Sequence, residues 1–328
     1  MRMLVFLLKH IARLVLLALL VAFVTFWLSS IIPGDFFSTQ GLSSGVRAET
    51  VEQLRHKYGL DQPAYIQFVR WLIRLFRMDL GESLFYQRPV ASVVADALVK
   101  TLWIGLPALI LGFGGGVMLG ALHGMMGRRP LGRFLDLFST IALSLPSLLL
   151  GLMALLLAAH TQWFPLGGMS SLGNPEAGLW HGLADRIHHL LLPVACLTLP
   201  VLASVERIQY SATRAQDDEF YLRFARSRGL GSIRLFFHYI LLPGLNPVLS
   251  ISGPMLGAIL SGSLVLEVIF AWPGLGQITY DALFNNDLFL LAGCVVGSSL
   301  VLVAGNVLAD LALVTLDPRT RSFARKGF

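Results

Sequence analysis

The sequence contains few charged residues, and this scarcity argues against an ordinary soluble protein. Only 13% of its 328 residues are Asp, Glu, Lys or Arg, whereas soluble domains have about 25%. Hydrophobic residues make up 55% of the chain, too many for a soluble core alone. The net charge of +6 does not indicate nucleic-acid binding, because the Lys and Arg residues are dispersed among apolar runs. The composition therefore predicts an integral membrane protein.

Cysteine is nearly absent, and the sequence lacks motifs for redox or nucleotide chemistry. Cys196 and Cys294 lie in apolar segments and form no C-x-x-C pair, so we interpret them as small core residues. Five glycines cluster over residues 112–120, but no Lys-Ser or Lys-Thr follows them and no strand precedes them. Small residues in an apolar helix allow close helix packing instead. We therefore expect this chain to bind no nucleotide, metal or other cofactor of its own.

Long apolar runs are abundant. A helix needs about 20 residues to cross a bilayer, and six segments reach this length. The first is too long for a signal peptide, and no small-residue cleavage site follows it. The predicted fold class is an all-α polytopic membrane protein. Its six spans are expected at about residues 11–32, 98–122, 136–160, 188–206, 248–271 and 288–314.

The basic residues predict how the chain is oriented. Fifteen Lys and Arg residues lie in the two termini and in loops 125–135 and 207–239, whereas the two shorter loops of the other set contain only Arg186. Long loops count little in the positive-inside rule, so the seven basic residues of segment 33–96 do not reverse the assignment. We predict that both termini are cytoplasmic. The expected parts are the N-terminus with the first span (1–32), a periplasmic segment (33–96), a membrane core (97–316) and a cytoplasmic tail (317–328).

The periplasmic segment contains two helical patterns. The first covers residues 49–58 and ends at Gly59; the second follows Asp61 and covers 62–78. The aromatic residues and arginines of the second helix fit a helix lying in the membrane interface. A small cap packed on the spans explains the same pattern, and the sequence does not separate the two.

We call residues 209–247, between the fourth and fifth spans, the coupling loop. Its four central arginines would each cost several kcal/mol inside a bilayer, so the loop lies outside the hydrocarbon. Apolar spacing predicts a helix over 219–228, with Phe220, Phe224 and Ser227 on one face, which Gly229 and Gly231 end. A second helix is expected from Ser232, closed by Pro243 and Pro247, with four apolar residues on one side: Ile233, Phe236, Phe237 and Ile240.

This pattern has two interpretations. A helix, a glycine turn and a second helix with an apolar edge suit docking into a partner's groove. Alternatively, the loop only fixes the orientation of the chain through its positive charge.

The coupling loop resembles the "EAA" loop of binding-protein-dependent ABC importer permeases. Residues 221–230, YLRFARSRGL, are similar to the form used by the oligopeptide, dipeptide and nickel branch. Arg223, Phe224 and Ala225 occupy the first three places of the general motif, so its Glu is absent, and Gly229 is its glycine. Further similar elements occur in family order: L-D-Q-P at 60–63, D-L-G-E-S at 79–83, S-L-P-S at 144–147, W-F-P-L-G-G at 163–168, H-L-L-L-P at 189–193, V-L-E-V-I-F-A-W-P-G-L-G at 265–276 and L-D-P-R at 316–319.

The resemblance implies a B-type permease subunit in a bacterial inner membrane. It implies a second homologous permease, two ATPase subunits that bind ATP and Mg²⁺, and a periplasmic or lipid-anchored binding protein. This chain itself would catalyse nothing. The cargo is a peptide, a metal chelate or an opine, and the sequence does not decide between them. The residues expected to couple to the ATPase are Glu219, Tyr221, Arg223, Phe224, Ala225, Arg226, Gly229 and Leu230.

Several residues are candidates for the pathway or for an alternative function. A proline inside the third span predicts a kink, which either lines the pathway or serves packing. Acidic residues within spans are functional candidates, so a proton-coupled secondary transporter using Glu267 or Asp310 is the alternative, although no inverted repeat is visible. An intramembrane protease would need a nucleophile and a base at one depth, and the predicted topology provides none. The pathway and gate candidates are Ser144, Pro146, Ser147, Glu267, Trp272 and Pro273.

Three histidines and Asp185 share one helical face near the start of the fourth span. This face could bind a metal, or it is a polar helix start at the membrane surface. The resemblance favours the second interpretation. The histidines are His181, His188 and His189.

Overall fold

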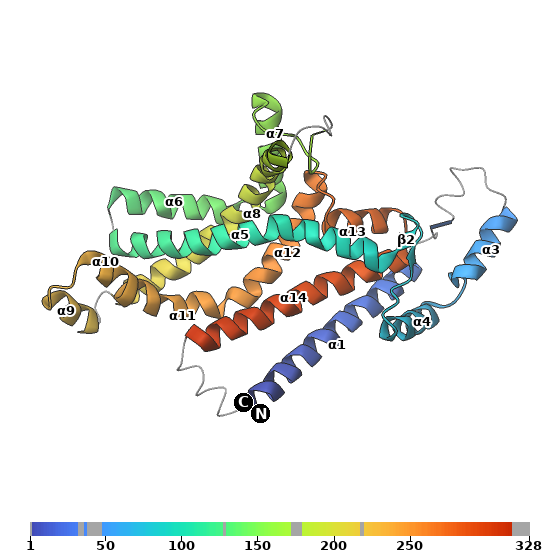
Figure 1. Cartoon of the computed structure of the whole chain (residues 1–328), viewed down its shortest axis with the longest axis horizontal. Coiled ribbons are helices and arrows are strands. Elements are labelled where there is room, and N and C mark those ends of the chain that lie inside the picture. The colour runs from blue at the N-terminus through green and yellow to red at the C-terminus, as the bar shows by residue number, and fades with distance from the viewer. Residues whose placement is uncertain are drawn as a thin grey trace. The chain divides into compact units, whose positions relative to one another are not determined.

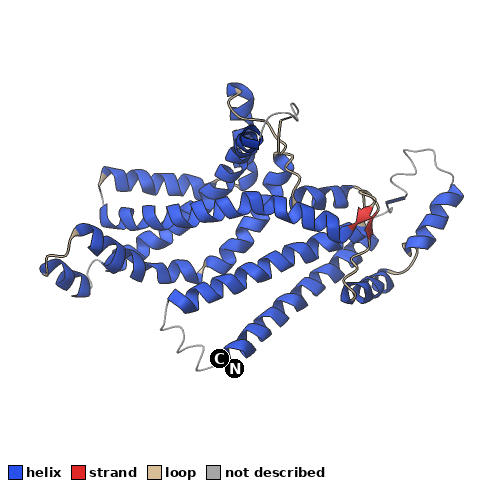
Figure 2. Ribbon diagram, viewed as in Figure 1, coloured by secondary structure: helices blue, strands red, loops and turns tan. Residues whose placement is uncertain are grey.

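A computed structural model describes the chain at residues 2–31, 36–37, 48–126, 129–171, 179–216 and 220–316. Over these residues the chain is helical apart from one short β-hairpin (Figure 2). Four of the described helices are long and apolar enough to cross a membrane, and a bent helix pair is a fifth candidate. The predicted class of an all-α polytopic membrane protein is therefore confirmed. The four long helices are α5 (Val90–Met126), α8 (Leu179–Gln216), α12 (Ser252–Ile269) and α14 (Leu288–Leu316).

The chain divides into two compact units. The first contains residues 3–101 and 273–303, and the second contains residues 102–272 with the described residues from 304 onward. Helices α5 and α14 therefore each contribute residues to both units. The remaining helices and strands of the first unit are α1 (Arg2–Ile31), α3 (Ala48–Tyr58), α4 (Ala64–Phe76), β1 (Glu82–Ser83), β2 (Arg88–Pro89) and α13 (Leu275–Phe284).

A buried carboxylate holds the β-hairpin in the first unit. Asp287 accepts hydrogen bonds from Ser83 Oγ at 2.7 Å and from the Phe85 amide at 3.1 Å. It also accepts from the Leu290 amide at 3.1 Å, as an N-cap of α14 does. The Tyr86 hydroxyl donates to Asp281 at 2.7 Å. Burial and the neighbouring Asp281 carboxylate raise the pKa of Tyr86 above its ordinary value, so the hydroxyl stays a donor into the alkaline range.

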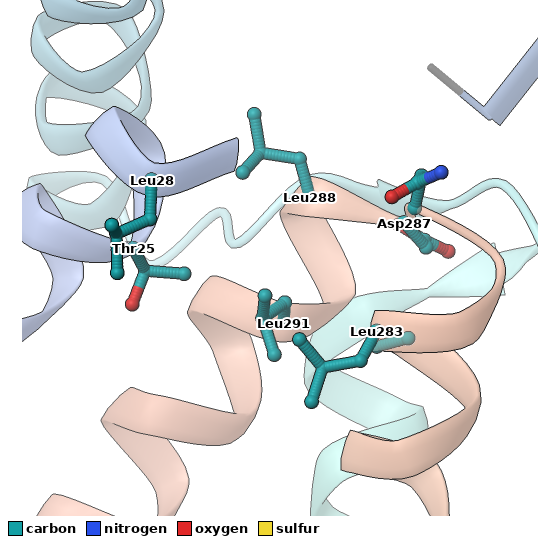
Figure 3. A pocket seen from close by; sticks show the side chains of 8 residues that line it. Thr25, Leu28, Leu283, Asp287, Leu288 and Leu291 are labelled. Atoms are coloured by element: carbon teal, nitrogen blue, oxygen red, sulfur yellow. The ribbon is translucent and has the colours of Figure 1, made fainter. Parts of the chain in front are cut away.

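A small apolar cavity of about 250 Å³ lies in this unit beside α1, at the turn between α13 and α14 (Figure 3). Thr25 and Leu28 line it from α1, and leucines line it from the other side. Asp287 also lines it, but its carboxylate already accepts the hydrogen bonds described above. The cavity therefore presents an apolar wall rather than a polar binding site.

In the second unit, α5 and α8 approach each other closely through glycine. An added Cβ at Gly112, Gly116 or Gly120 would lie 2.4–2.7 Å from atoms of α8, closer than real Cβ contacts. The packing role predicted for the glycine cluster is thus confirmed for these three, whereas Gly114 faces open space. The unit also contains α6 (Pro130–Ser144), α7 (Ser147–Thr161), α9 (Phe220–Ser227), α10 (Ser232–Arg234), the π-helix η1 (Leu235–Leu241) and α11 (Leu242–Ser250) (Figure 1).

The third span is not one helix as the segment 136–160 suggested. Helices α6 and α7 meet at an angle of 103° across Leu145 and Pro146. A proline disfavours helical geometry in the preceding residue, and Leu145 is indeed extended, with φ −91° and ψ 122°. Pro146 then stands as the N-cap of α7. The expected kink is a full break, which separates α6, packed on α8, from α7, packed on both α8 and α12.

Candidate functional site

After α8 ends at Gln216, the described part of the coupling loop continues with α9, which has one buried and one exposed face. Leu222 and Ala225 are 1% and 2% exposed, and their spacing of three places them on the side that packs on the protein. Phe220 is 82% exposed and Phe224 is 49% exposed, at a spacing of four. The predicted helix is confirmed over Phe220–Ser227. Its two predicted aromatic residues share the face that the protein leaves uncovered.

The end of α9 is shaped by a glycine in the left-handed conformation. Gly229 has φ +72°, and no atom lies within 4 Å of the position a Cβ would take. A left-handed residue after the last helical turn is a common way to end a helix. The Arg228 guanidinium lies over the Phe224 ring, 4.5 Å from its centroid, so a cation–π contact borders the turn. The chain then enters α10 from Gly231, which is extended at φ −60° and ψ 146°.

The second helix of the loop is longer than the sequence suggested. The prediction that Pro243 and Pro247 close it is wrong, because α10, η1 and α11 follow one another without a break from Ser232 to Ser250. The π-helix bonds each residue to the fifth residue along the chain. Pro243 then falls in the first turn of α11, where a missing N–H is tolerated.

The predicted apolar side of this second helix is also divided. Phe236 and Ile240 are buried, whereas Ile233 is 77% exposed and Phe237 is 41% exposed. The exposed residues of both helices therefore include four large apolar side chains. Residues 220–241 contain four arginines and no acidic residue. This surface suits a partner whose groove is apolar and acidic. Its four exposed apolar residues are Phe220, Phe224, Ile233 and Phe237.

Short contacts join α9 and α11 to the last turns of α8. The Tyr221 hydroxyl lies 2.9 Å from Gln216 Oε1, at the end of α8, and 3.3 Å from the Tyr239 carbonyl oxygen. An added Cβ at Gly244 would lie 2.5 Å from Gln209 Nε2, so α11 packs tightly on α8. Tyr221 of α9 and Gly244 of α11 thus lie directly against α8.

A buried polar cluster joins α8 to its neighbours near this end. Glu206 Oε1 lies 2.6 Å from His123 Nδ1 on α5, and Glu206 Oε2 accepts from Ser139 Oγ on α6 at 2.7 Å. The His123 ring stacks on Tyr210, with ring centroids 4.1 Å apart. The side chains of His123, Ser139 and Glu206 are all almost fully buried. The cluster makes α5, α6 and α8 one stiff base beneath the coupling loop.

This cluster was not among the features predicted from the sequence. Glu267 and Asp310 were the acids expected within spans, but Glu206 is the last residue of the predicted fourth span and His123 directly follows the second. An ionisable residue in an apolar run was the signal that could have found it. What the sequence could not provide was the pairing, because the two residues are 83 positions apart.

The gate candidates lie in two places. Ser144 and Ser147 flank the break at Pro146, and Ser147 Oγ lies 3.6 Å from the Cβ position of Gly262 on α12. Ser144 Oγ donates within α6 to the Thr140 carbonyl oxygen at 2.7 Å. Glu267 and Trp272 are both fully buried, and the Trp272 amide donates to the Glu267 carbonyl oxygen at 2.8 Å. Glu267 and Trp272 are thus held inside the protein rather than exposed on a channel wall.

The histidine face has local structural partners. Asp185 accepts from the Ser171 amide at 2.8 Å and from Ser171 Oγ at 2.7 Å. His188 Nε2 lies 2.8 Å from the Trp163 carbonyl oxygen, and His189 Nδ1 lies 2.9 Å from the Asp185 carbonyl oxygen. These contacts hold the segment before α8 against the helix start. They favour the interpretation as a polar helix start over a metal site.

Some candidates cannot be placed. Glu219 lies outside the described residues, and the side chains of Arg226 and Asp310 are not described. The described coupling candidates differ in exposure. Tyr221, Arg223 and Phe224 are exposed on α9, Ala225 is buried, and Leu230 is half-buried after the turn.

Comparison with known proteins places most of the chain in one family. The family described as "Binding-protein-dependent transport system inner membrane component" matches residues 116–322, and its N-terminal companion matches residues 3–104. The chain is 33% identical over 273 residues to the oligopeptide transport system permease protein AppB of Bacillus subtilis, which covers 82% of this chain and 84% of that protein. It is 33% identical to the probable D,D-dipeptide transport system permease protein DdpB of Escherichia coli, covering 93% and 94%. It is 28% identical to the dipeptide transport system permease protein DppB of Lactococcus lactis, covering 96% and 99%.

Proposed function

Because this chain belongs to the family of binding-protein-dependent transport system inner membrane components, we propose that it carries a peptide across the membrane while ATPase subunits dock on its coupling loop. The chain is a non-catalytic permease subunit, and ATP is hydrolysed on partner subunits. It needs no cofactor of its own.

The observation that carries the docking proposal is the exposed face of α9. A helix that leaves Phe220 82% exposed, next to a positively charged surface, has an uncovered apolar anchor. Buried aromatic and arginine side chains commonly dominate the energy of an interface. Residues 220–241, which contain four arginines and no acidic residue, therefore match a partner groove with apolar walls and an acidic rim.

The proposed cargo is a peptide. The relatives named above are described as permeases for oligopeptides, dipeptides and D,D-dipeptides. The partners we propose are a second homologous permease, two ATPase subunits and a solute-binding protein. A binding-protein-dependent system requires delivery of the cargo from outside, so the binding protein would meet the face opposite the coupling loop.

The proposed orientation puts both termini and the coupling loop in the cytoplasm of a bacterial cell, with the chain in the inner membrane. The distribution of fifteen basic residues on one set of loops supports this. The residues between α1 and α5 would then lie on the periplasmic side.

The contacts of the second unit suggest how ATP hydrolysis reaches the spans. Movement of the ATPase subunits would push α9, whose buried Leu222 and Ala225 press on the protein. Tyr221 and the packing of α11 would transmit the push to α8. The Glu206 cluster would carry α5 and α6 along with α8 as one body. The broken helix pair α6–α7 would then change its angle at Pro146.

Cross-linking from Phe220 tests this function. We expect a photoreactive phenylalanine analogue at position 220 to form an adduct with the ATPase subunit in membranes that contain the whole transporter. The same analogue at Trp180 is a matched control, because Trp180 is 83% exposed and lies near the start of α8. It is roughly 50 Å along the helix from Gln216, the end of α8 that Tyr221 contacts. An ATPase adduct from position 180 and none from position 220 would refute both the docking site and the orientation.

A further inference from the structure

Helix α4 is fastened to α1 by aromatic side chains. Trp71 is 1% exposed, and its ring centroid lies 5.5 Å from that of Phe26. Phe68 makes edge contacts with Phe23 and Phe26 at centroid distances of 5.2 and 5.7 Å. Leu75 packs against the same core. These residues recur every three or four positions and form the packed face of α4.

A second face of α4 is apolar and uncovered. Its four side chains lie at spacings of four, four and three, so they form one stripe along the helix. Each is between 49% and 80% exposed. An exposed apolar stripe of this kind beside a packed core indicates an interaction surface. The residues of this stripe are Tyr65, Val69, Ile73 and Phe76.

The third face of α4 carries only positive charge. Arg70, Arg74 and Arg77 lie at spacings of four and three and are all exposed. None of them pairs with a carboxylate among the described residues, and α4 contains no acidic residue. At 100° per residue, this arginine face points away from both apolar faces. The helix therefore has one side for the protein, one for an apolar medium and one for anions.

The contacts with α1 place α4 near one end of the apolar part of α1, which runs over Val15–Leu28. Phe23 and Phe26 lie eight and five residues before Ile31, where α1 ends, a distance of roughly 8–12 Å along the helix. The polar region of one bilayer leaflet is about 5–8 Å thick, outside a hydrocarbon core of about 30 Å. Figure 1 shows α4 running across the direction of α1 rather than along it. A helix held there lies near the boundary between the acyl chains and the headgroups.

We propose that α4 binds anionic lipid in the membrane interface, with its apolar stripe among the acyl chains and its three arginines on lipid phosphates. Helix α1 also leaves apolar side chains uncovered, since Leu20 and Trp27 are each 56% exposed, and such side chains on an apolar helix suit contact with acyl chains. Arginine suits phosphate because its planar guanidinium donates two parallel hydrogen bonds. An amphipathic helix with apolar and cationic faces is the general form of such a lipid-binding element.

The depth of the stripe is measured with a spin label. A nitroxide is placed at Ile73 in the whole transporter, reconstituted in nanodiscs of phosphatidylcholine and phosphatidylglycerol, with the buried Cys196 and Cys294 replaced by alanine. The label should collide more often with oxygen, which concentrates in acyl chains, than with a water-soluble nickel chelate. The exposed residue Glu82 in the same unit is the control and should show the opposite preference. A label at Ile73 that prefers the nickel chelate would overturn the proposal.

The role of the arginine face is tested by removing its three positive charges and measuring how much anionic lipid the transporter retains. The triple variant R70Q/R74Q/R77Q should retain about tenfold less phosphatidylglycerol in native mass spectrometry of the purified transporter, because each arginine near an anionic surface contributes to binding. The triple lysine variant keeps the charge and should retain most of the lipid. Arg88→Gln is the matched control, because Arg88 already pairs with Asp96 at 2.9 Å.

The same variants separate lipid from protein as the occupant of this surface. Unchanged lipid retention in the triple glutamine variant, with weaker binding of the solute-binding protein, would overturn the proposal and assign α4 to protein docking. Unchanged lipid retention and unchanged protein binding would overturn it as well. Exposed arginines contribute little to folding, and a normal elution volume of the variant would verify this.

Discussion

Gly229→Val is expected to leave the permease folded and inserted but to weaken its binding to the ATPase subunits by about 5- to 30-fold. Gly229 has φ +72°, where a side chain costs about 1–2 kcal/mol, and valine adds the crowding of a β-branched residue. The strain re-aims α9 or shifts the turn, so the exposed Phe220 and Phe224 no longer meet their groove. Co-purification of the ATPase subunits in detergent measures binding, and uptake of peptide should fall with it.

Gly231→Val is the matched control for this change. Gly231 also faces open space, but its backbone is extended at φ −60° and ψ 146°, a conformation that valine adopts readily. Both variants add the same side chain two residues apart. An equal loss of ATPase binding in both variants would mean that the bulk of the side chain, rather than the left-handed turn, disturbs docking. Normal binding and uptake in both would remove this turn from its proposed role.

Gly120→Ala is expected to destabilise the fold itself, by about 3 kcal/mol. An alanine Cβ at Gly120 would lie 2.4 Å from the Glu206 carbonyl oxygen and 2.7 Å from Gln209 Cβ. The first of these is a backbone atom, which can move away only if α5 and α8 separate. That separation would also disturb the His123–Glu206 contact at 2.6 Å. A lower thermal unfolding midpoint of the purified chain in detergent measures the loss.

Gly114→Ala provides the control on the same helix. No atom lies within 4 Å of the Cβ position of Gly114, so the added methyl group meets no neighbour. Alanine is also favoured over glycine inside a helix by about 0.5–1 kcal/mol. The midpoint of this variant should stay constant or rise. A Gly120→Ala variant as stable as Gly114→Ala would contradict the close packing of α5 on α8.

The fold class and the first helix of the coupling loop could be predicted because they depend on local patterns. Apolar length alone identified the four described helices that are long and apolar enough to cross a membrane. The spacing of Phe220 and Phe224, with Gly229 behind them, located α9, whose described residues Phe220–Ser227 lie within the predicted range 219–228. A glycine often ends a helix, and a cluster of arginines stays outside the hydrocarbon, so both signals act over a few neighbouring residues.

The features that escaped prediction depend on contacts between distant residues or on unusual helix geometry. Pro243 normally suggests a helix end, but the π-helix before it lets the helix continue. Pro146 predicted a kink, whereas the structure has a break of 103° there, and its size depends on how α6 packs on α8 and how α7 packs on both α8 and α12. The pairing of His123 with Glu206 joins residues 83 positions apart. In the second helix of the loop, periodicity identified an apolar side but not which of its residues, Phe236 or Ile233, the protein would cover.

ATP-driven uptake tests the central conclusion most directly. The chain is reconstituted in proteoliposomes with its second permease, the ATPase subunits and the binding protein, and uptake of a labelled pentapeptide is followed. Uptake should require both ATP and the binding protein, stop with a non-hydrolysable ATP analogue, and continue after the proton gradient is collapsed. Uptake that persists without ATP but disappears with the proton gradient would contradict this function and favour a proton-coupled transporter that uses Glu267 or Asp310.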